Sequence, residues 1–241
     1  MPEAVLDAKA LDRLRAFDTP TICNAINVVA PQAPKNFTSE TLICAAPDLP
    51  SMVGYAKTAR MRGTRPSPMG KEEERAFELK YWAYVAAGPR PTISVMQDID
   101  GAQAGYAALW GDVNALLHQG LGCVGGITSG CIRDLHQIPP GFQLLAAKVT
   151  PFGSWSHFVE FDCDVLVCGM AVKSGDLVHA DRNGATVIPA EIAAQVADAA
   201  DYVARRERII TDAAKRPGLT VDDIAKAYAQ TSAMKFEAKK R

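Results

Sequence analysis

Three short motifs between residues 110 and 134 determine how this chain is expected to fold. They read Trp110-Gly111-Asp112-Val113-Asn114-Ala115, Gly120-Leu121-Gly122-Cys123-Val124-Gly125-Gly126 and Ser129-Gly130-Cys131-Ile132-Arg133-Asp134. The first motif begins a helix with a glycine, which leaves backbone N–H groups free for an anion. The second is typical of a buried strand, and after a glycine turn the third places an arginine beside an aspartate. Together they predict an active site.

Arg133 and Asp134 offer complementary chemistry to a ligand. A guanidinium can bind a carboxylate through two parallel hydrogen bonds, and a carboxylate is a hard oxygen ligand for Mg²⁺ or Mn²⁺. An isolated Arg-Asp pair usually just starts a helix at the surface, but the glycine-rich context favours function here. Asp112 has two interpretations: a stabilising first-turn carboxylate, or a group that orients a metal-bound water or transfers a proton.

Composition excludes several classes of protein. The chain has 241 residues, 48% of them hydrophobic and 22% charged, which suits a soluble globular protein. Its 26 basic residues face 27 acidic ones, so no general basic field attracts nucleic acid. We find no run of about 18 apolar residues that would span a membrane and no secretory signal. The six cysteines form no CxxC pair, which favours a reducing compartment. We therefore expect a cytoplasmic protein with neither nucleic-acid nor membrane partners.

Apolar spacing predicts alternating strands and helices. The expected helices span 6–17, 19–26 (with Thr19 as N-cap and Pro20 as its first residue), 71–87, 112–121, a short stretch from about 133, 189–214, and a last helix capped by Thr220. The expected strands span 53–62, 92–97, 123–128, 142–150 and 164–168, with a hairpin over 175–189 that turns at Asn183-Gly184. Residues 30–51 are expected to form a loop. The pattern predicts one α/β domain with a central mixed sheet over residues 1–217, flanked by helical terminal segments and followed by a helical extension over 218–241.

Other metal-ligating or nucleophilic residue types have simpler interpretations. His179 and Asp181 would share one face of a strand, but Asp181 is more simply a hairpin-turn aspartate. Three further histidines are expected to be structural or to support the site: His118, His136 and His157. The cysteines have no evident activating base, so none is predicted as a nucleophile.

The chain resembles the RraA-like family, which includes the 4-hydroxy-4-methyl-2-oxoglutarate aldolases and the regulators of RNase E activity. The resemblance covers about residues 17 to 210. It rests on the following motifs, which occur in the family's order and with its 22-residue step from Gly111 to Arg133: Trp110 to Val113, Leu121 to Gly126, Gly130 to Asp134, Gly175 to Leu177 with Asp181, Gly184, and Ile188-Pro189. The chain departs from the family pattern at three places: Ser129, Cys23-Asn24 and Asn114. These departures leave the identity of the substrate open.

The resemblance implies a swivelling β/β/α-type fold assembled as a homotrimer or homohexamer. It implies that Gly111, Asp112, Val113 and Asn114 bind the pyruvyl end of a 2-oxo acid, that Arg133 contacts the same group, and that Asp134 holds Mg²⁺ or Mn²⁺. In family aldolases a glutamate of the C-terminal helix reaches a neighbouring subunit's site, and Glu207 is the nearest match. The alternative for Glu207 is a solvated helix face, because it stands in the charged run Arg205 to Arg208.

Three functions follow as hypotheses. The first is a metal-dependent class II pyruvate aldolase with Asp112, Arg133 and Glu207 as catalytic residues, which also decarboxylates oxaloacetate. The second is a regulator that binds and inhibits a ribonuclease without catalysis. The third is the same metal site acting on an unrelated substrate, such as a lactone or a sugar-acid derivative.

Overall fold

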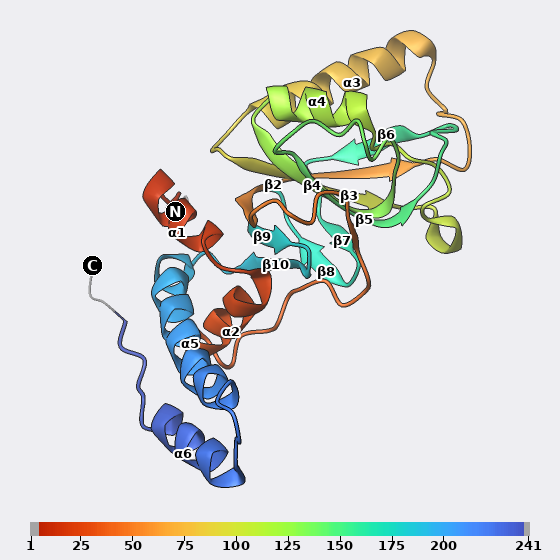
Figure 1. The fold of residues 1–241 in the computed structure, drawn as a ribbon. Coiled ribbons are helices and arrows are strands. Elements are labelled where there is room, and N and C mark those ends of the chain that lie inside the picture. The colour runs from red at the N-terminus through yellow and green to blue at the C-terminus, as the bar shows by residue number, and fades with distance from the viewer. Residues whose placement is uncertain (1–4, 239–241) are drawn as a thin grey trace.

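A mixed sheet of eight strands forms the centre of the molecule, as the computed structural model shows for residues 5–238 (Figure 1). The order is β1-β5-β4-β3-β2-β9-β10, and β6 pairs with β2. The strands are β1 Ile43–Cys44, β2 Met52–Arg62, β3 Thr92–Asp98, β4 Cys123–Ile132, β5 Gln143–Val149, β6 His157–Phe161, β9 Leu177–Asp181 and β10 Gly184–Ile188. Strands β2 to β5 run parallel, so their carboxyl ends meet at one edge. Open α/β sheets bind ligands at that edge.

The two faces of the sheet are covered differently. The helices are α1 Ala8–Arg15, α2 Thr19–Val29, α3 Lys71–Ala86, α4 Asp112–Gly120, α5 Ala193–Ala214 and α6 Val221–Ser232, with a 3₁₀ turn over Gly101–Gln103. Helices α3 and α4 cover one face, where Tyr81 and Ala115 pack with Met96 and Ile132. The small antiparallel pair β7 Val165–Val167 and β8 Met170–Val172 covers the other. This layering confirms the predicted α/β architecture.

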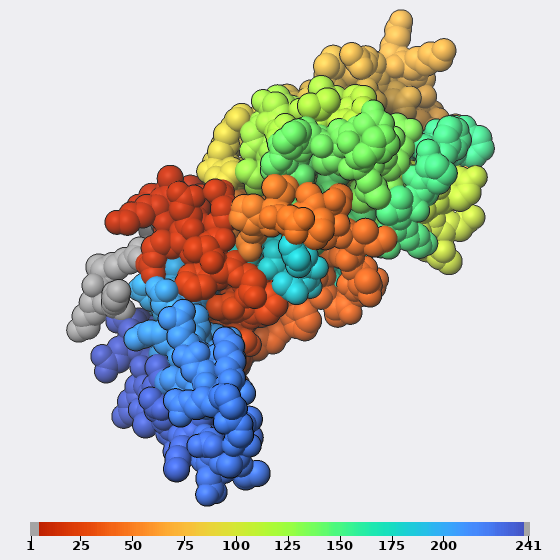
Figure 2. All heavy atoms as spheres, in the orientation of Figure 1, coloured from red at the N-terminus to blue at the C-terminus, as the bar shows by residue number. Residues whose placement is uncertain are grey.

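The terminal helices form a third cluster beside the β9–β10 hairpin. Helices α1, α2 and α5 pack there on the start of β2 through apolar residues such as Leu14, Ile22 and Val196. The end of α5 and α6 protrude from the body of the molecule (Figure 2). The predicted cap of α6 by Thr220 is confirmed, because Thr220 Oγ1 accepts the Asp223 N–H. The division into 1–217 and 218–241 stays a prediction.

The structure corrects three of the predicted elements: a helix start, a whole helix and the end of a strand. Thr19 is the first residue of α2 rather than its N-cap, because the Asp18 side chain accepts the Thr21 N–H at 2.9 Å. The predicted helix from Arg133 is wrong: Asp134 adopts a left-handed φ of 56°, which α-helical geometry excludes. Strand β4 continues past Thr128 to Ile132, with a register shift against β5 where a turn was expected.

Three short strands were not predicted, namely β1, β6 and β8. The remaining strands, the hairpin and the long helices are confirmed to within a few residues. No helix in the 5–238 range is long and apolar enough to cross a membrane. Part of the amino-terminal segment searched for a secretory signal, and the end of the 218–241 extension, lie outside the described residues.

Candidate active site

The start of α4 and the end of β4 lie side by side at the carboxyl edge of the sheet. Trp110 forms an isolated parallel bridge with Ile132, and the Arg133 N–H donates to the Trp110 carbonyl at 3.0 Å. Gly111 follows as the N-cap of α4, and its carbonyl accepts the Ala115 N–H. Two motifs 22 residues apart are thereby held together by backbone hydrogen bonds.

Close packing by neighbouring side chains, rather than backbone conformation, requires a glycine at position 111. Its φ of −157° is open to any residue. A Cβ atom at this position would lie 2.5 Å from Asp134 Oδ2 and 3.1 Å from Arg133 Nε. Both charged side chains therefore pack directly against the start of the helix.

Arg133 and Asp134 form a partly exposed ion pair. Arg133 Nε lies 3.3 Å from Asp134 Oδ2, and the two side chains are 38% and 28% exposed. Arg133 Nε is buried and makes no hydrogen bond to any described residue. A Cβ on Gly153 would lie 3.7 Å from Arg133 Nη1, which places the loop 150–156 beside the guanidinium. No sequence motif indicated this loop.

The first turn of α4 presents backbone donors next to that pair. The N–H groups of Asp112, Val113 and Asn114 have no partners within the helix, as at any helix start, and the helix dipole favours an anion there. The Asn114 side chain donates to the Leu109 carbonyl at 2.5 Å. The Asn114 side chain therefore stabilises the turn before α4, and the group of Asn114 that remains for a ligand is its backbone N–H.

A buried hydrogen-bond chain supports α4 from behind. His118 Nδ1 lies 2.7 Å from the Asn114 carbonyl, which can only accept, so Nδ1 carries the proton. His118 Nε2 then accepts from the Tyr81 hydroxyl of α3 at 2.6 Å. Burial lowers the pKa of His118 to about 4, outweighing the opposite effect of the Asn114 carbonyl, and keeps the ring neutral. Tyr81 is a supporting residue that no sequence motif indicated.

Glu207 lies apart from this cluster within one chain. It sits on α5, where Asn24 Nδ2 of α2 donates to its Oε1 at 3.3 Å. Both residues border a hollow of about 230 Å³ between the two helices. Figure 1 places α5 and α4 at opposite ends of the molecule. The structure therefore brings together the predicted residues 111–114, 133 and 134, but not Glu207.

His179 and Asp181 have structural roles, as the simpler interpretation predicted. His179 is fully buried and pairs with Thr19 Oγ1 and the Leu14 carbonyl. Asp181 accepts the N–H groups of Thr19 and Asn183. Burial also raises the pKa of the thiol in each of the six cysteines, which argues against a thiolate nucleophile.

The metal-ligating residue types are sparse around Asp134. Within residues 5–238, no group of three or more His, Cys, Asp or Glu side chains is placed to hold a metal ion. A cation at Asp134 would therefore keep most of its waters. Mg²⁺ favours this kind of site, because it dehydrates reluctantly and commonly binds through one or two carboxylates.

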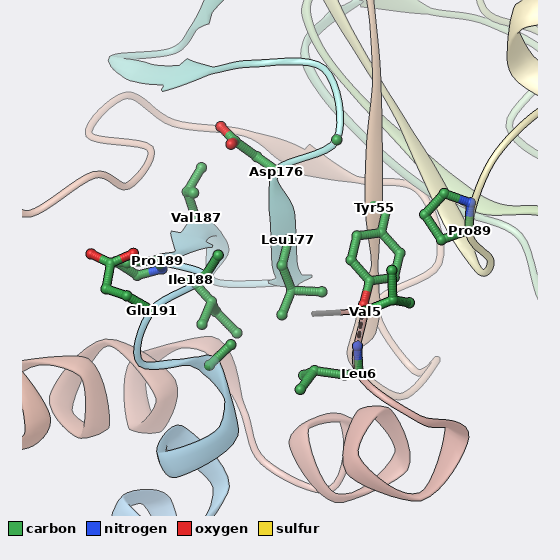
Figure 3. A pocket seen from close by; sticks show the side chains of 13 residues that line it. Val5, Leu6, Tyr55, Pro89, Asp176, Leu177, Val187, Ile188, Pro189 and Glu191 are labelled. Atoms are coloured by element: carbon green, nitrogen blue, oxygen red, sulfur yellow. Dashed lines mark hydrogen bonds between the residues drawn. The ribbon is translucent and has the colours of Figure 1, made fainter. Parts of the chain in front are cut away.

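A separate cavity of about 310 Å³ contains none of the predicted site residues (Figure 3). It lies between the amino-terminal segment, the start of β9 and the β10–α5 connection. Tyr55 and Leu177 point into this region, and the Tyr55 hydroxyl accepts the Leu6 N–H at 2.8 Å. Its lining is mixed apolar and acidic, with no Lys, Arg or His that would attract an anion.

Comparison with known proteins identifies relatives of this chain. A family model described as RraA-like, Aldolase/RraA, matches residues 19–187. A protein of Halorhodospira halophila, named as a candidate 4-hydroxy-4-methyl-2-oxoglutarate aldolase, is 32% identical over 59% of this chain and 84% of its own length. An uncharacterized Methanocaldococcus jannaschii protein is 28% identical over 49% of this chain, and the match spans 58% of that protein.

Solved structures show the same fold at lower identity. An uncharacterized Pseudomonas syringae protein superposes with a TM-score of 0.72 at 19% identity, covering 95% of this chain and 97% of that one. Streptomyces coelicolor RraAS2, described as an unusual member of the RNase ES inhibitor RraA protein family, gives 0.64 at 21% identity, covering 89% and 100%. At these identities the likeness concerns the fold alone.

Proposed function

Because the chain belongs to the RraA-like, Aldolase/RraA family, we propose that it is a divalent-metal-dependent lyase that releases pyruvate from a 4-hydroxy-2-oxo acid. 4-Hydroxy-4-methyl-2-oxoglutarate is the model substrate, and oxaloacetate decarboxylation is a related activity. One observation carries the proposal: Gly111 brings the donors of α4 against Arg133 and Asp134. The family name alone does not separate catalysis from regulation.

The arrangement supports a specific binding mode for a 2-oxo acid. The planar fork of Arg133 binds the C1 carboxylate through two hydrogen bonds. The N–H groups of residues 112–114 complete the anion site. These groups fix the substrate so that its 2-oxo oxygen lies on the side of Asp134.

The chemical step is the reverse of an aldol addition. The C3–C4 bond breaks and its electron pair moves into the 2-oxo group, which gives the enolate of pyruvate. The C4 hydroxyl loses its proton to Asp112 or to a water held by Asp112, so that C4 becomes a carbonyl. Protonation of the enolate at C3 then gives pyruvate. In oxaloacetate the same bond position loses CO₂ and leaves the same enolate.

Asp134 is the residue that would hold the metal. Its carboxylate is a hard oxygen ligand and is partly exposed, which fits a hydrated Mg²⁺ or Mn²⁺. When bound, the cation supplies Lewis acidity at the 2-oxo oxygen. Arg133 keeps its place beside Asp134 and neutralises the substrate carboxylate.

The assembly is part of the proposal. Glu207 completes the site only if a second copy of the chain brings its α5 to Arg133, as in a homotrimer or homohexamer. Glu207 is exposed on α5, so its carboxylate is accessible to a second copy of the chain. The Asn24 side chain of the same chain donates to its Oε1.

A pyruvate-release assay tests the proposal. The substrates are oxaloacetate and a panel of 4-hydroxy-2-oxo acids, each with Mg²⁺, with Mn²⁺ and with EDTA. We expect turnover with either metal, none with EDTA, and a loss of about 10²-fold or more in kcat/KM for Asp134→Asn. If no substrate is cleaved under any condition, the lyase is refuted and ribonuclease inhibition becomes the function to assay. If the variant keeps full activity, Asp134 is not the metal ligand.

A further inference from the structure

We infer that Asn24 is a positioning residue of the proposed lyase, because it holds the Glu207 carboxylate in one orientation. This inference rests on the proposed function, in which Glu207 completes the site around Arg133 of a second copy of the chain. It adds to that site a residue of α2 for which no motif predicted a role.

Helices α2 and α5 form one packed unit (Figure 1). Ile22 of α2 and Val196 and Ala199 of α5 are fully buried in the same apolar cluster. Close packing of this kind does not let one helix slide along the other without a loss of contacts. An assembly that brings Glu207 of α5 to Arg133 of a second copy therefore brings the adjoining face of α2 with it.

The Glu207 carboxylate has a neutral hydrogen-bond partner, although it stands in the charged run Arg205 to Arg208. Among residues 5–238 it forms no ion pair. It accepts instead from Asn24 Nδ2 at 3.3 Å. Helix α2 carries no charged side chain between Thr19 and Val29. An amide donor fixes the direction of the carboxylate and leaves its negative charge in place, as a group that takes up a proton requires.

The hollow between α2 and α5 places this hydrogen bond beside the surface that a second copy would reach. Asn24, Asn27 and Glu207 all border its volume of about 230 Å³. A group of a second copy that hydrogen-bonds to Glu207 Oε1 comes within about 6 Å of Asn24 Nδ2, because two hydrogen-bond lengths separate them. Asn24 therefore acts on the site through Glu207 and does not itself touch the reacting atoms.

A comparison of two isosteric variants tests the inference in the pyruvate-release assay with Mg²⁺. Asn24→Asp keeps the shape of the side chain but replaces its donor with a carboxylate, which repels Glu207. We expect kcat to fall about tenfold or more, because small misplacements of a catalytic group have large costs. KM should change by less than about twofold, because Arg133 and α4 still bind the substrate carboxylate.

Asn27→Asp is the matched control for this substitution. Asn27 lies one turn further along α2, is also exposed and borders the same hollow. The variant introduces the same charge without removing the hydrogen bond that Glu207 accepts. We expect its kcat to stay within about twofold of the wild-type value.

A double-mutant cycle shows whether Asn24 acts through Glu207. In the Glu207→Gln background, Asn24→Asp should cause no further loss of kcat, because the new amide is not repelled and can donate to the new carboxylate. A residue that merely stabilised α2 would cause the same loss in both backgrounds. Sedimentation and the thermal midpoint of each variant report its assembly and folding.

The outcomes separate this inference from the proposed function. Full activity of Asn24→Asp or of Glu207→Gln, equal losses in the two Asp variants, or additive losses in the cycle would each overturn the inference and leave the lyase standing. A lower mass of Asn24→Asp in sedimentation would also overturn it, because Asn24 would then be an interface contact. Absence of cleavage by the wild-type chain would overturn the lyase, and the inference with it.

Discussion

At the scale of single residues, Gly111 shows how the absence of a side chain can create a site. Its neighbours Arg133 and Asp134 occupy the space that a Cβ would need. The sequence revealed that Gly111 begins a helix, because Gly before an acidic first turn is a common helix start. The family resemblance implied that Gly111 and Arg133 bind the same group, but local patterns could not reveal the close packing between them, because that contact depends on the β4–Trp110 pairing.

We predict that Gly111→Ala lowers kcat/KM by about 10²-fold with little effect on the fold. The new methyl group would displace the ion pair, and small misplacements of binding groups have costs of this order. Steady-state kinetics and the thermal midpoint are the measurements.

Gly70→Ala is the matched control for this substitution. Gly70 is also a helix N-cap in extended conformation, and a Cβ there meets nothing within 4 Å. Equal losses of activity in the two variants would show that the close approach at Gly111 is unimportant.

At the scale of elements, sequence patterns identified long segments well and short ones poorly. Helix α3 and the hairpin β9–β10 carry their own start, stop and turn signals, and both were predicted. Strands β1 and β6 have two and five residues and pair with the distant strands β5 and β2, so local patterns carry little information about them. The helix expected from Arg133 fails because one backbone dihedral, that of Asp134, takes an uncommon value.

The buried histidine of α4 predicts a pH dependence of stability. The folded pKa of His118 is about 4, against about 6.5 in an unfolded chain. Between these values the unfolded state binds more protons, so the free energy of unfolding falls as pH falls. His118 alone should remove about 2 kcal/mol between pH 8 and pH 5. Urea unfolding at both pH values measures this loss.

Two variants isolate that contribution. His118→Gln cannot titrate, so its stability should fall by about 2 kcal/mol less over the same pH interval than that of the wild type. His136→Gln serves as the control, because His136 is exposed and solvated in both states. A pH dependence that is unchanged in His118→Gln would show that this ring is not held neutral by burial.

At the scale of the whole molecule, the carboxyl-terminal extension packs on the domain without entering the sheet. The Tyr202 hydroxyl of α5 donates to the Met234 carbonyl at 3.1 Å, and the Tyr202 and Phe236 rings lie 5.7 Å apart. We predict that a chain ending at residue 217 folds, with a thermal midpoint lower by roughly 2–8 °C. Circular dichroism and calorimetry measure this. An unfolded product would show that residues 218–241 belong to the domain.

The assembly makes a second prediction at this scale. Arg133→Lys and Glu207→Gln should each have low activity alone. If Glu207 serves a neighbouring site, mixed oligomers of the two variants should recover about a quarter of the wild-type sites, because some sites combine two intact residues. Co-expression with two affinity tags and the pyruvate assay test this. Failure to recover activity in confirmed mixed oligomers would exclude Glu207 from the neighbouring site.

The left-handed backbone at Asp134 has a consequence for the evolution and engineering of this protein. Glycine accepts that conformation without steric cost, whereas other residues pay on the order of 1 kcal/mol. Selection for heat resistance alone would therefore tend to replace this aspartate with glycine and erase its carboxylate. A thermostabilisation campaign that screens only for folding should hold position 134 constant.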